Sequence, residues 1–175
     1  MASTQHNEVT MTQLDDGNNT FYQHRLERLG IAYRTIRHDP VTTMERSLEF
    51  DCLIAKNMLV RNKRDDTYFL LMTSPTARID FKKLAQTLKT SRSSLNFASA
   101  DELAAVLHTV SGLVSPLAVP ESHVANLRLL VDTQLCHQPA LGFHAGKNTE
   151  TLVVSYTDLQ KFCELLGYTI TPIAL

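Results

Sequence analysis

The stretch GFHAGKNT, residues Gly142–Thr149, lies between two apolar runs, Leu127–Val131 and Leu152–Val154. Glycine and asparagine tolerate positive φ, so the stretch is predicted to be the turn of a hairpin. It also gathers an imidazole, an ammonium, an amide and a hydroxyl, which a turn chosen for geometry alone does not need. Two interpretations stay open: an ordinary hairpin in which His144 has no role, and a functional site that includes it.

The composition of the whole chain excludes several classes of protein. The chain has 175 residues, of which 43% are hydrophobic and 20% charged, so it can bury a core and is expected to form one folded domain. The net charge of -1 gives no overall basic field, which argues against a general DNA or RNA coat. No apolar run approaches the roughly 18 residues of a membrane helix. Neither DNA nor a membrane is an expected partner.

The cysteines and the N-terminus indicate the compartment. Cys52, Cys136 and Cys163 are far apart and contain no CxxC pair, which argues against a disulfide framework and favours a reducing environment. The N-terminus lacks the basic-then-apolar order of a signal peptide. We therefore expect a cytoplasmic protein.

The pattern of elements predicts an α+β fold. Residues 1–19 are polar and are expected to form a disordered or loosely attached leader, and residues 20–175 the folded domain. Apolar periodicity and capping signals predict helices at 21–29, 81–89, 99–108 and 155–166, with a short one after Thr42 or Thr43. Strands are predicted at 31–37, 52–61, 68–72, 95–97, 127–131, 151–155 and 168–171. Without regular βαβ alternation, these elements predict a mixed, mainly antiparallel sheet of about seven strands with packed helices.

Lys56 and Asn57 interrupt the otherwise apolar strand predicted at 52–61. The pair could be a solvent-facing or bulged part of the strand. Alternatively, a lysine on a rigid strand beside a pocket can bind a phosphate or a carboxylate. Both interpretations stay open.

A glycine four positions before a proline marks the segment Val110–Leu117 as a loop. Its amides could point one way and bind an oxyanion or a carbonyl, although plain turns have the same composition. Ser115 could be a nucleophile with His144 as its base, but the sequence has no G-x-S-x-G elbow and no third member of a triad. A metal site is not expected either, because the spacing of the candidate ligands matches no usual zinc pattern; these are His123, Cys136, His137 and His144.

The most basic part of the chain surrounds the helix predicted at 81–89. A solvated helix face explains such residues, and a surface that follows an RNA backbone is the alternative. The residues are Arg78, Lys82, Lys83, Lys89 and Arg92.

Three separated motifs occur in a familiar order: Lys-Asn-Met-Leu-Val-Arg at 56–61, Gly-x-x-Ser-Pro at 112–116, and Gly-Phe-His at 142–144 followed by Asn-Thr at 148–149. Together they closely resemble the YbaK-like, prolyl-tRNA synthetase-associated editing domain family, over about Thr20 to Leu175. The His-x-x-x-Asn-Thr form resembles the free-standing Ala-tRNA(Pro) deacylase branch rather than the Cys-tRNA(Pro) branch. The resemblance implies a trans-editing hydrolase that needs no cofactor and acts on mischarged tRNA(Pro), with prolyl-tRNA synthetase as a further possible partner.

The resemblance also implies roles for individual residues. Backbone amides of 112–116 would hold the substrate carbonyl or oxyanion, Lys56 the aminoacyl-adenosine end, and His144 the substrate or a water. The residues implied in catalysis are Lys56, Gly112, Ser115, Pro116 and His144. The residues implied in substrate binding are Asn57, Leu113, Val114, Gly142, Phe143, Asn148 and Thr149.

The sequence departs from the family pattern at positions that bear on the substrate. Ala145-Gly146-Lys147 follows the histidine where a proline and another polar residue are usual, Ser111 replaces a proline, and Leu117 replaces an aromatic residue. Such changes alter pocket width or loop stiffness, and so the amino acid that is removed. The alternatives are a deacylase for Cys-tRNA(Pro) or another small residue, and a non-catalytic module that binds tRNA or a synthetase.

Overall fold

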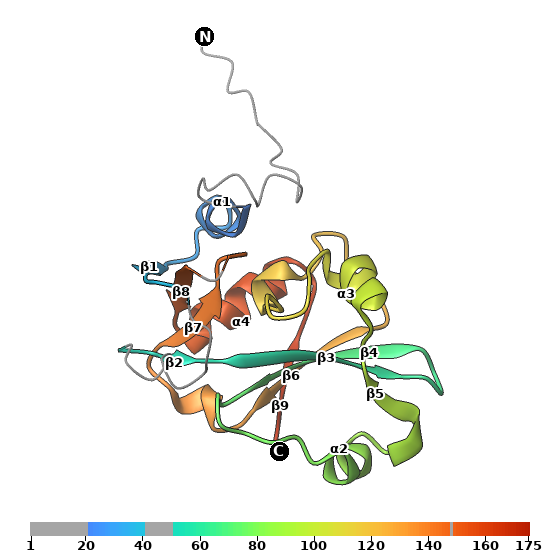
Figure 1. Cartoon of the computed structure of the whole chain (residues 1–175). Helices are drawn as coiled ribbons and strands as arrows, with labels where there is room; N and C mark the ends of the chain where they lie inside the picture. Colours follow the sequence, from blue (N-terminus) through green and yellow to red (C-terminus); the bar gives the residue numbers. More distant parts are fainter. Residues whose placement is uncertain (1–20, 41–50, 148) are drawn as a thin grey trace.

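The computed structural model describes residues 21–40, 51–147 and 149–175, which form two mixed β-sheets with helices packed against them (Figure 1). The predicted leader 1–19, the helix predicted after Thr42 or Thr43, and Asn148 lie outside the described residues. Within the described ranges, no helix has the length and apolar character needed to cross a membrane.

The smaller sheet has four strands in the order β1-β8-β7-β2. β7 and β8 form an antiparallel hairpin, β1 is antiparallel to β8, and β2 is parallel to β7. The strands are β1 Arg34–Arg37, β2 Leu53–Ile54, β7 Leu141–His144 and β8 Glu150–Val154.

The larger sheet has five strands in the order β5-β3-β4-β6-β9. β3 is antiparallel to both β4 and β5, whereas β4, β6 and β9 run parallel. Its strands are β3 Lys56–Asn62, β4 Thr67–Thr73, β5 Leu95–Phe97, β6 Leu127–Asp132 and β9 Ile170–Ile173.

Helices cover both faces of the larger sheet (Figure 1). The α-helices are α1 Phe21–Arg28, α2 Phe81–Thr87, α3 Ala100–Leu107 and α4 Tyr156–Leu165, and the 3-10 helices are η3 Arg92–Ser94, η4 Pro116–Ala118 and η5 Leu135–His137. Side chains cap three of the α-helices: Asp80 caps α2, Ser99 and Glu102 form a capping box at α3, and Ser155 caps α4. Each cap satisfies backbone amides that the first helical turn leaves free.

Two hydrophobic clusters lie on opposite sides of the larger sheet. Successive side chains of a strand point to opposite faces, so Leu59 joins the cluster beneath α3 and α4, and Val60 joins the cluster beneath α2. β4 is buried on both faces and is accordingly almost wholly apolar. The α+β class with a mixed sheet is therefore confirmed, with the strands divided between two sheets.

Three predicted elements differ from the structure. The strand predicted at 52–61 divides at Ala55, where the chain leaves the smaller sheet as β2 and enters the larger one as β3. Gly142, Phe143 and His144 belong to strand β7 rather than to a turn. The last strand continues through Pro172, which an edge strand such as β9 tolerates because it has a partner on one side alone.

Candidate active site

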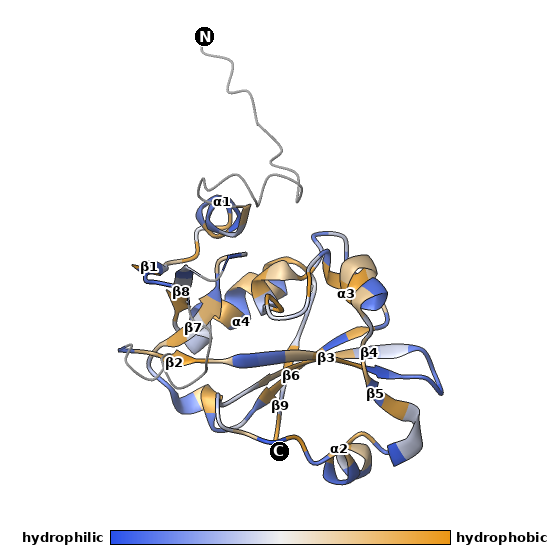
Figure 2. Cartoon of the chain, viewed as in Figure 1, coloured by the Kyte–Doolittle hydropathy of each residue, from blue (hydrophilic) through white to orange (hydrophobic). Residues whose placement is uncertain are grey.

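The structure places Lys56 and His144 at the same end of two parallel strands. β2 and β7 pair with Ile54 opposite Gly142, and the Ala55 amide donates to the Gly142 carbonyl at 3.0 Å. Lys56 and His144 each follow two residues later, just beyond the carboxyl end of this pairing, where Lys56 already begins β3 of the larger sheet and His144 ends β7 of the smaller one. Figure 2 shows the corresponding hydrophilic segment at the start of β3, next to hydrophobic β2.

Gly142 and Phe143 hold the strand that carries His144. A Cβ at Gly142 would lie 2.4 Å from Ile54 Cδ1 and 2.9 Å from Thr151 Cγ2, so the close approach of β2 and β8 requires glycine. Phe143 is fully buried in the core on the opposite face of β7. Gly142 does not have the positive φ that the turn interpretation supposed; Gly146 does, at 91°.

His144 has a neutral ring with an unsatisfied nitrogen. Its Nδ1 is buried and has no hydrogen-bond partner among the described residues. Burial first, and then the charge of nearby His38, lowers the pKa of His144. His38 Nε2 lies 3.0 Å from the hydroxyl of Thr151, which stands opposite His144 in the hairpin. A neutral imidazole with a free nitrogen can make one more hydrogen bond, to a substrate or a water.

Lys56 and Asn57 use different faces of β3 because strand side chains alternate. The Lys56 ammonium makes a long hydrogen bond of 3.4 Å to the Ala77 carbonyl. The Asn57 amide nitrogen donates to the Ala55 carbonyl at 3.3 Å, and its Oδ1 is buried without a partner in the described part of the chain. The two adjacent residues therefore do not form one polar pair.

Among the described residues, no strand pairs with the first part of β3 on the edge that faces away from β4. β4 pairs with all of Lys56–Asn62, whereas β5 pairs on the other edge with Val60, Arg61 and Asn62 alone. On that edge the Leu59 carbonyl still accepts from the Ala98 amide at 2.9 Å. Residues two apart direct their backbone groups to the same edge, so those of Asn57 face the open part.

The segment 112–116 is a loop whose conformation is set by the positive φ of Gly112 and by the helix cap that Ser115 forms. Gly112 has φ of +89° and nothing within 4 Å of an added Cβ, so its backbone rather than its surroundings favours glycine. Ser115 is fully buried, and its Oγ accepts from the Leu117 amide at 3.2 Å as the cap of η4. That hydroxyl is used as a structural cap, which does not favour the nucleophile interpretation. Val114 and Pro116 are also buried, whereas Leu113 is partly exposed.

Arg25 fastens this loop and was not predicted. Although it is 3% exposed, its two terminal nitrogens donate to the carbonyls of Leu117 and Val119 at 2.6 and 2.7 Å. Its guanidinium also lies over the rings of Phe21 and Phe162. The signal was its position four residues after Phe21, on the apolar stripe of α1. No hydrogen bond joins the loop directly to Lys56 or His144 within the described residues.

Ion pairs hold the turn after His144. Glu150 is almost fully buried and pairs with Lys147 at 3.4 Å and with Arg37 at 3.1 Å. The Thr149 carbonyl accepts from the His38 amide at 3.0 Å, which ties the turn to the end of β1. Thr149 therefore has a structural contact through its backbone, and Asn148 lies outside the described residues.

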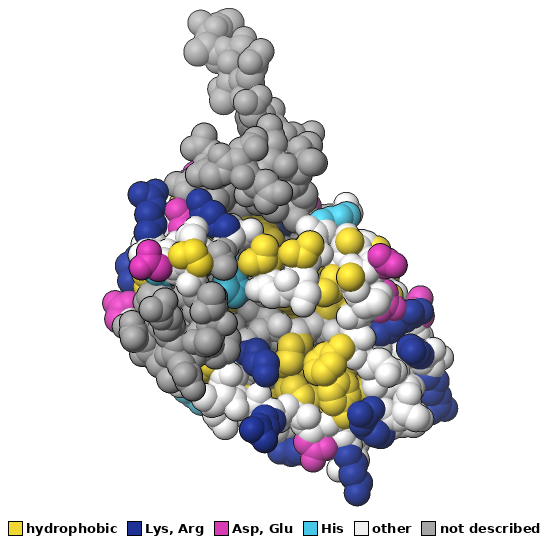
Figure 3. All heavy atoms as spheres, in the orientation of Figure 1, with side chains coloured by type: hydrophobic (Ala, Val, Ile, Leu, Met, Phe, Trp, Pro, Cys, Tyr) yellow, Lys and Arg dark blue, Asp and Glu magenta, His cyan; other side chains and the backbone are white. Residues whose placement is uncertain are grey.

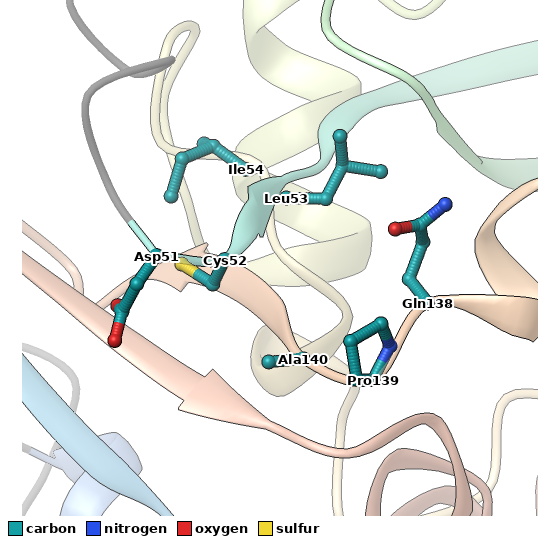
Figure 4. Close-up of a pocket in the computed structure, with 7 residues that line it drawn as sticks. All are labelled: Asp51, Cys52, Leu53, Ile54, Gln138, Pro139 and Ala140. Carbon is teal, nitrogen blue, oxygen red and sulfur yellow. The ribbon is translucent and has the colours of Figure 1, made fainter.

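A separate cavity lies at the other end of the β2–β7 pair. It has a volume of about 300 Å³, and Figure 4 shows the residues around it: Asp51, Cys52, Leu53, Ile54, Gln138, Pro139 and Ala140. None of the predicted site residues that the structure describes lines this cavity. Burial and the neighbouring Asp51 raise the pKa of the Cys52 thiol, which keeps it protonated. The described ranges contain no group of three His, Cys, Asp or Glu side chains that could hold a metal ion.

Comparison with known proteins was made for sequence and for structure. In sequence, the family model for the aminoacyl-tRNA editing domain matches residues 39–162. A prolyl-tRNA editing protein, ProX, from Acetoanaerobium sticklandii is 32% identical over 155 residues, which cover 86% of this chain and 93% of that protein. A crystal structure assigned as a trans-editing enzyme for prolyl tRNA synthetase superposes with a TM-score of 0.66 at 17% identity, covering 87% of this chain and 94% of the other. A hypothetical protein of known structure gives the same TM-score of 0.66 at 17% identity, covering 86% and 96%.

Proposed function

This chain belongs to the aminoacyl-tRNA editing domain family and is a hydrolase of aminoacyl-tRNA, and we propose that it acts in trans on mischarged tRNA(Pro), with Ala-tRNA(Pro) as its preferred substrate. The name of the bacterial relative supports prolyl-tRNA as the substrate class. The alanine preference is supported by the His-x-x-x-Asn-Thr form of the motif at 144–149. Prolyl-tRNA synthetase, as the source of the mischarged product, and a cytoplasmic location belong to the same proposal.

One observation carries the assignment of the active site. Lys56 and His144 both lie next to the carboxyl end of the β2–β7 pairing, and His144 has a buried nitrogen without a partner among the described residues. A cation and a neutral hydrogen-bonding ring on rigid strands can orient an anionic ligand and a water.

In the proposed reaction, water attacks the carbonyl carbon of the ester, and the bond to the ribose oxygen breaks to release the amino acid and the free tRNA end. An aminoacyl ester is already activated, so orientation and stabilisation of the developing oxyanion are the main requirements. Backbone amides between Gly112 and Ser115 hold the oxyanion, and the Ser115 cap together with Pro116, which has no N–H of its own, fixes their direction. Lys56 binds the terminal adenosine end, and His144 holds the attacking water.

The remaining predicted residues belong to the binding of the acceptor end. Asn57 offers the backbone groups at the open edge of β3, and Asn148 and Thr149 hold or flank the terminal nucleotide. Gly142 and Phe143 act indirectly, because they position the strand of His144.

Selectivity for alanine would come from size. A synthetase pocket made for proline rejects a smaller residue weakly, because one methylene changes binding by about 1 to 3 kcal/mol. A second and smaller pocket can exclude proline by steric clash. Leu113 and Val114, within the loop that holds the carbonyl, are the proposed walls.

The direct test measures loss of labelled amino acid from Ala-tRNA(Pro), with Pro-tRNA(Pro) and Cys-tRNA(Pro) in parallel. We expect rapid loss of alanine alone, and greatly slowed loss with Lys56→Ala and His144→Ala. Loss of cysteine instead would keep the mechanism and change the substrate. If the wild type hydrolyses none of the esters, the chain would be a binding module and the proposed reaction would be wrong.

A further inference from the structure

An exposed aromatic side chain stands at the edge of the larger sheet. Phe97 on β5 is 57% exposed, and no other aromatic residue is among the large hydrophobic side chains exposed in the described ranges. Its ring meets the Phe81 ring edge-on, with centroids 5.0 Å apart. The Arg92 guanidinium lies 4.6 Å from the centroid of Phe81. These contacts hold Phe97 as a fixed aromatic surface that still faces the solvent.

Most of the charges around this surface are positive, and its cations make no ion pair among the described residues. Several arginines elsewhere pair with acids, as Arg61 does with Asp66 at 2.7 Å and Arg34 does with Asp51 at 2.9 Å. Near α2, five exposed cations have no ion pair within the residues that the structure describes: Arg78, Lys82, Lys83, Lys89 and Arg92. The acid in the same segment, Asp80, accepts from the first amides of α2.

The same face of the sheet leads from Phe97 to the proposed active site. Phe97 stands opposite Val60 on β3, and alternation puts Met58 and Lys56 on that face as well. Val60 and Lys56 are four residues apart, which is about 13 Å along a strand. The Lys56 ammonium contacts the Ala77 carbonyl, in the segment that leads into α2. Figure 3 shows a hydrophobic patch on this side of the molecule, bordered by Lys and Arg side chains.

We propose that Phe97, backed by Phe81 and Arg92, is a stacking platform for an unpaired base of the tRNA 3′ end, and that the cations near α2 bind its phosphates. The proposal rests on the proposed function, because it explains how the terminal adenosine is guided to Lys56. Single-stranded nucleic acids bind where aromatic rings accept bases beside a positively charged path. A docked protein fits less well, since the cores of protein interfaces are depleted of charged residues.

The first test measures binding of a labelled, uncharged acceptor-stem hairpin with an unpaired 3′ end, using the full chain. Phe97→Leu removes the ring and keeps an apolar side chain, so affinity should fall about 5- to 150-fold, the range expected when one base can no longer stack. Phe97→Trp should bind like the wild type. Leu165→Ala is the matched control, because Leu165 is similarly exposed, at 53%, on α4. A blunt hairpin without the unpaired end should bind Phe97→Leu and wild type equally.

Salt dependence separates the bases from the phosphates. Phe97→Leu should leave the slope of log affinity against log salt unchanged. Replacing Lys82, Lys83 and Lys89 by alanine should make the slope shallower by about 0.7 for each phosphate that the variant no longer neutralises. Alanine at Lys63 and Arg64, in the exposed β3–β4 turn, should leave the slope unchanged. If Phe97→Leu binds the tailed hairpin as the wild type does, the platform is wrong.

Hydrolysis distinguishes this proposal from the proposed function. Phe97→Leu should lower kcat/KM for Ala-tRNA(Pro) but not for alanyl-adenosine, which lacks the preceding nucleotides, whereas Lys56→Ala should lower both. Equal rates for wild type and Phe97→Leu on Ala-tRNA(Pro) would overturn the platform and leave the deacylase intact. If the wild type hydrolyses neither ester, but binds the tailed hairpin more tightly than Phe97→Leu does, the deacylase would be overturned and the platform supported. If Phe97→Leu binds RNA as the wild type does but no longer binds purified prolyl-tRNA synthetase, the patch is a protein-docking surface and the platform is wrong.

Discussion

The two halves of the proposed site are built in opposite ways. The loop at 112–116 is tied to the core: Ser115 caps η4, and the buried Arg25 binds two carbonyls just beyond it. The strand ends instead keep buried polar atoms without partners among the described residues, namely His144 Nδ1 on β7 and Asn57 Oδ1 on β3. An unsatisfied buried polar atom is costly unless a ligand or a water fills it. The difference suggests that the loop supplies fixed geometry and the strand ends supply contacts that substrate completes.

The largest expected effect is the loss of deacylation rate when Lys56, at the strand ends, is replaced. Lys56→Ala should lower kcat for Ala-tRNA(Pro) by about 10²- to 10³-fold, because groups that stabilise developing charge in an active site contribute on this scale. Its free energy of unfolding should change little, since the ammonium makes a single long hydrogen bond of 3.4 Å. Single-turnover deacylation and urea unfolding measure the two quantities.

Lys63→Ala is the matched control, because Lys63 is exposed in the β3–β4 turn. It should keep the wild-type rate. Equal loss of rate in both variants would show that general charge, rather than the position of Lys56, determines activity.

The second prediction concerns the loop at 112–116 and the arginine that anchors it. Arg25→Met should lower the free energy of unfolding by about 3 kcal/mol, because two buried carbonyls lose their donors. Activity should fall as well, since the loop loses its anchor. Arg28→Ala, which removes an exposed partner of Glu121, should cost less than about 1 kcal/mol in denaturant unfolding. A stable but inactive Arg25→Met would mean that the arginine acts on the loop without supporting the core.

A pair of glycine substitutions sharpens the comparison further. Gly142→Ala should destabilise the protein by about 1 to 3 kcal/mol through overpacking, because its Cβ would lie 2.4 Å from Ile54 Cδ1. Gly112→Ala should cost about 1 to 2 kcal/mol through its left-handed backbone, with no clash. Asparagine tolerates positive φ, so Gly112→Asn should recover part of the loss, whereas Gly142→Asn should be worse than alanine. Thermal and urea unfolding of the four variants test this order.

Local signals predicted much of this fold, and long-range contacts account for the rest. The helices that begin after Asp80, Ser99 and Ser155 follow from local capping signals, and the structure has a side-chain cap at each of these residues. The break at Ala55 depends on pairing with β7, far away in sequence, so an apolar run could not reveal it. The predicted α+β class was nevertheless correct, because it depends on the order of elements rather than on their exact pairing.

The same limit applies to the candidate site. Motif order predicted one site for Lys56 and His144, and the parallel pairing of β2 with β7 brings the chain at both residues to the same end of that pair. Adjacent Lys56 and Asn57 invited a common role, yet strand alternation separates their side chains. Gly142 suggested a turn because glycine in sequence does not distinguish positive φ from close packing. Arg25 left a readable signal, a charged residue on the apolar stripe of a helix.

The smallest expected effect is the pH dependence of His144. Its pKa is lowered in the folded protein, by burial first and then by His38, whereas in the unfolded chain it is about 6.5. As the pH falls below about 6.5, the unfolded chain binds a proton that the folded chain does not, so the free energy of unfolding decreases until the folded pKa is passed. Above about 6.5 neither state is protonated and the contribution is constant.

Urea unfolding between about pH 5 and pH 8 measures this contribution as the difference between wild type and His144→Asn, whose side chain does not titrate. The wild type should lose stability relative to the variant on acidification, by at most about 1.4 kcal/mol per pH unit for one proton. Because the ring is neutral near pH 7, the deacylation rate of the wild type should be flat there and fall on the acid side alone. A wild type that gains stability relative to His144→Asn as the pH falls would mean that the ring is held as a cation. Its role would then be to pair with charge on the substrate rather than to position a water.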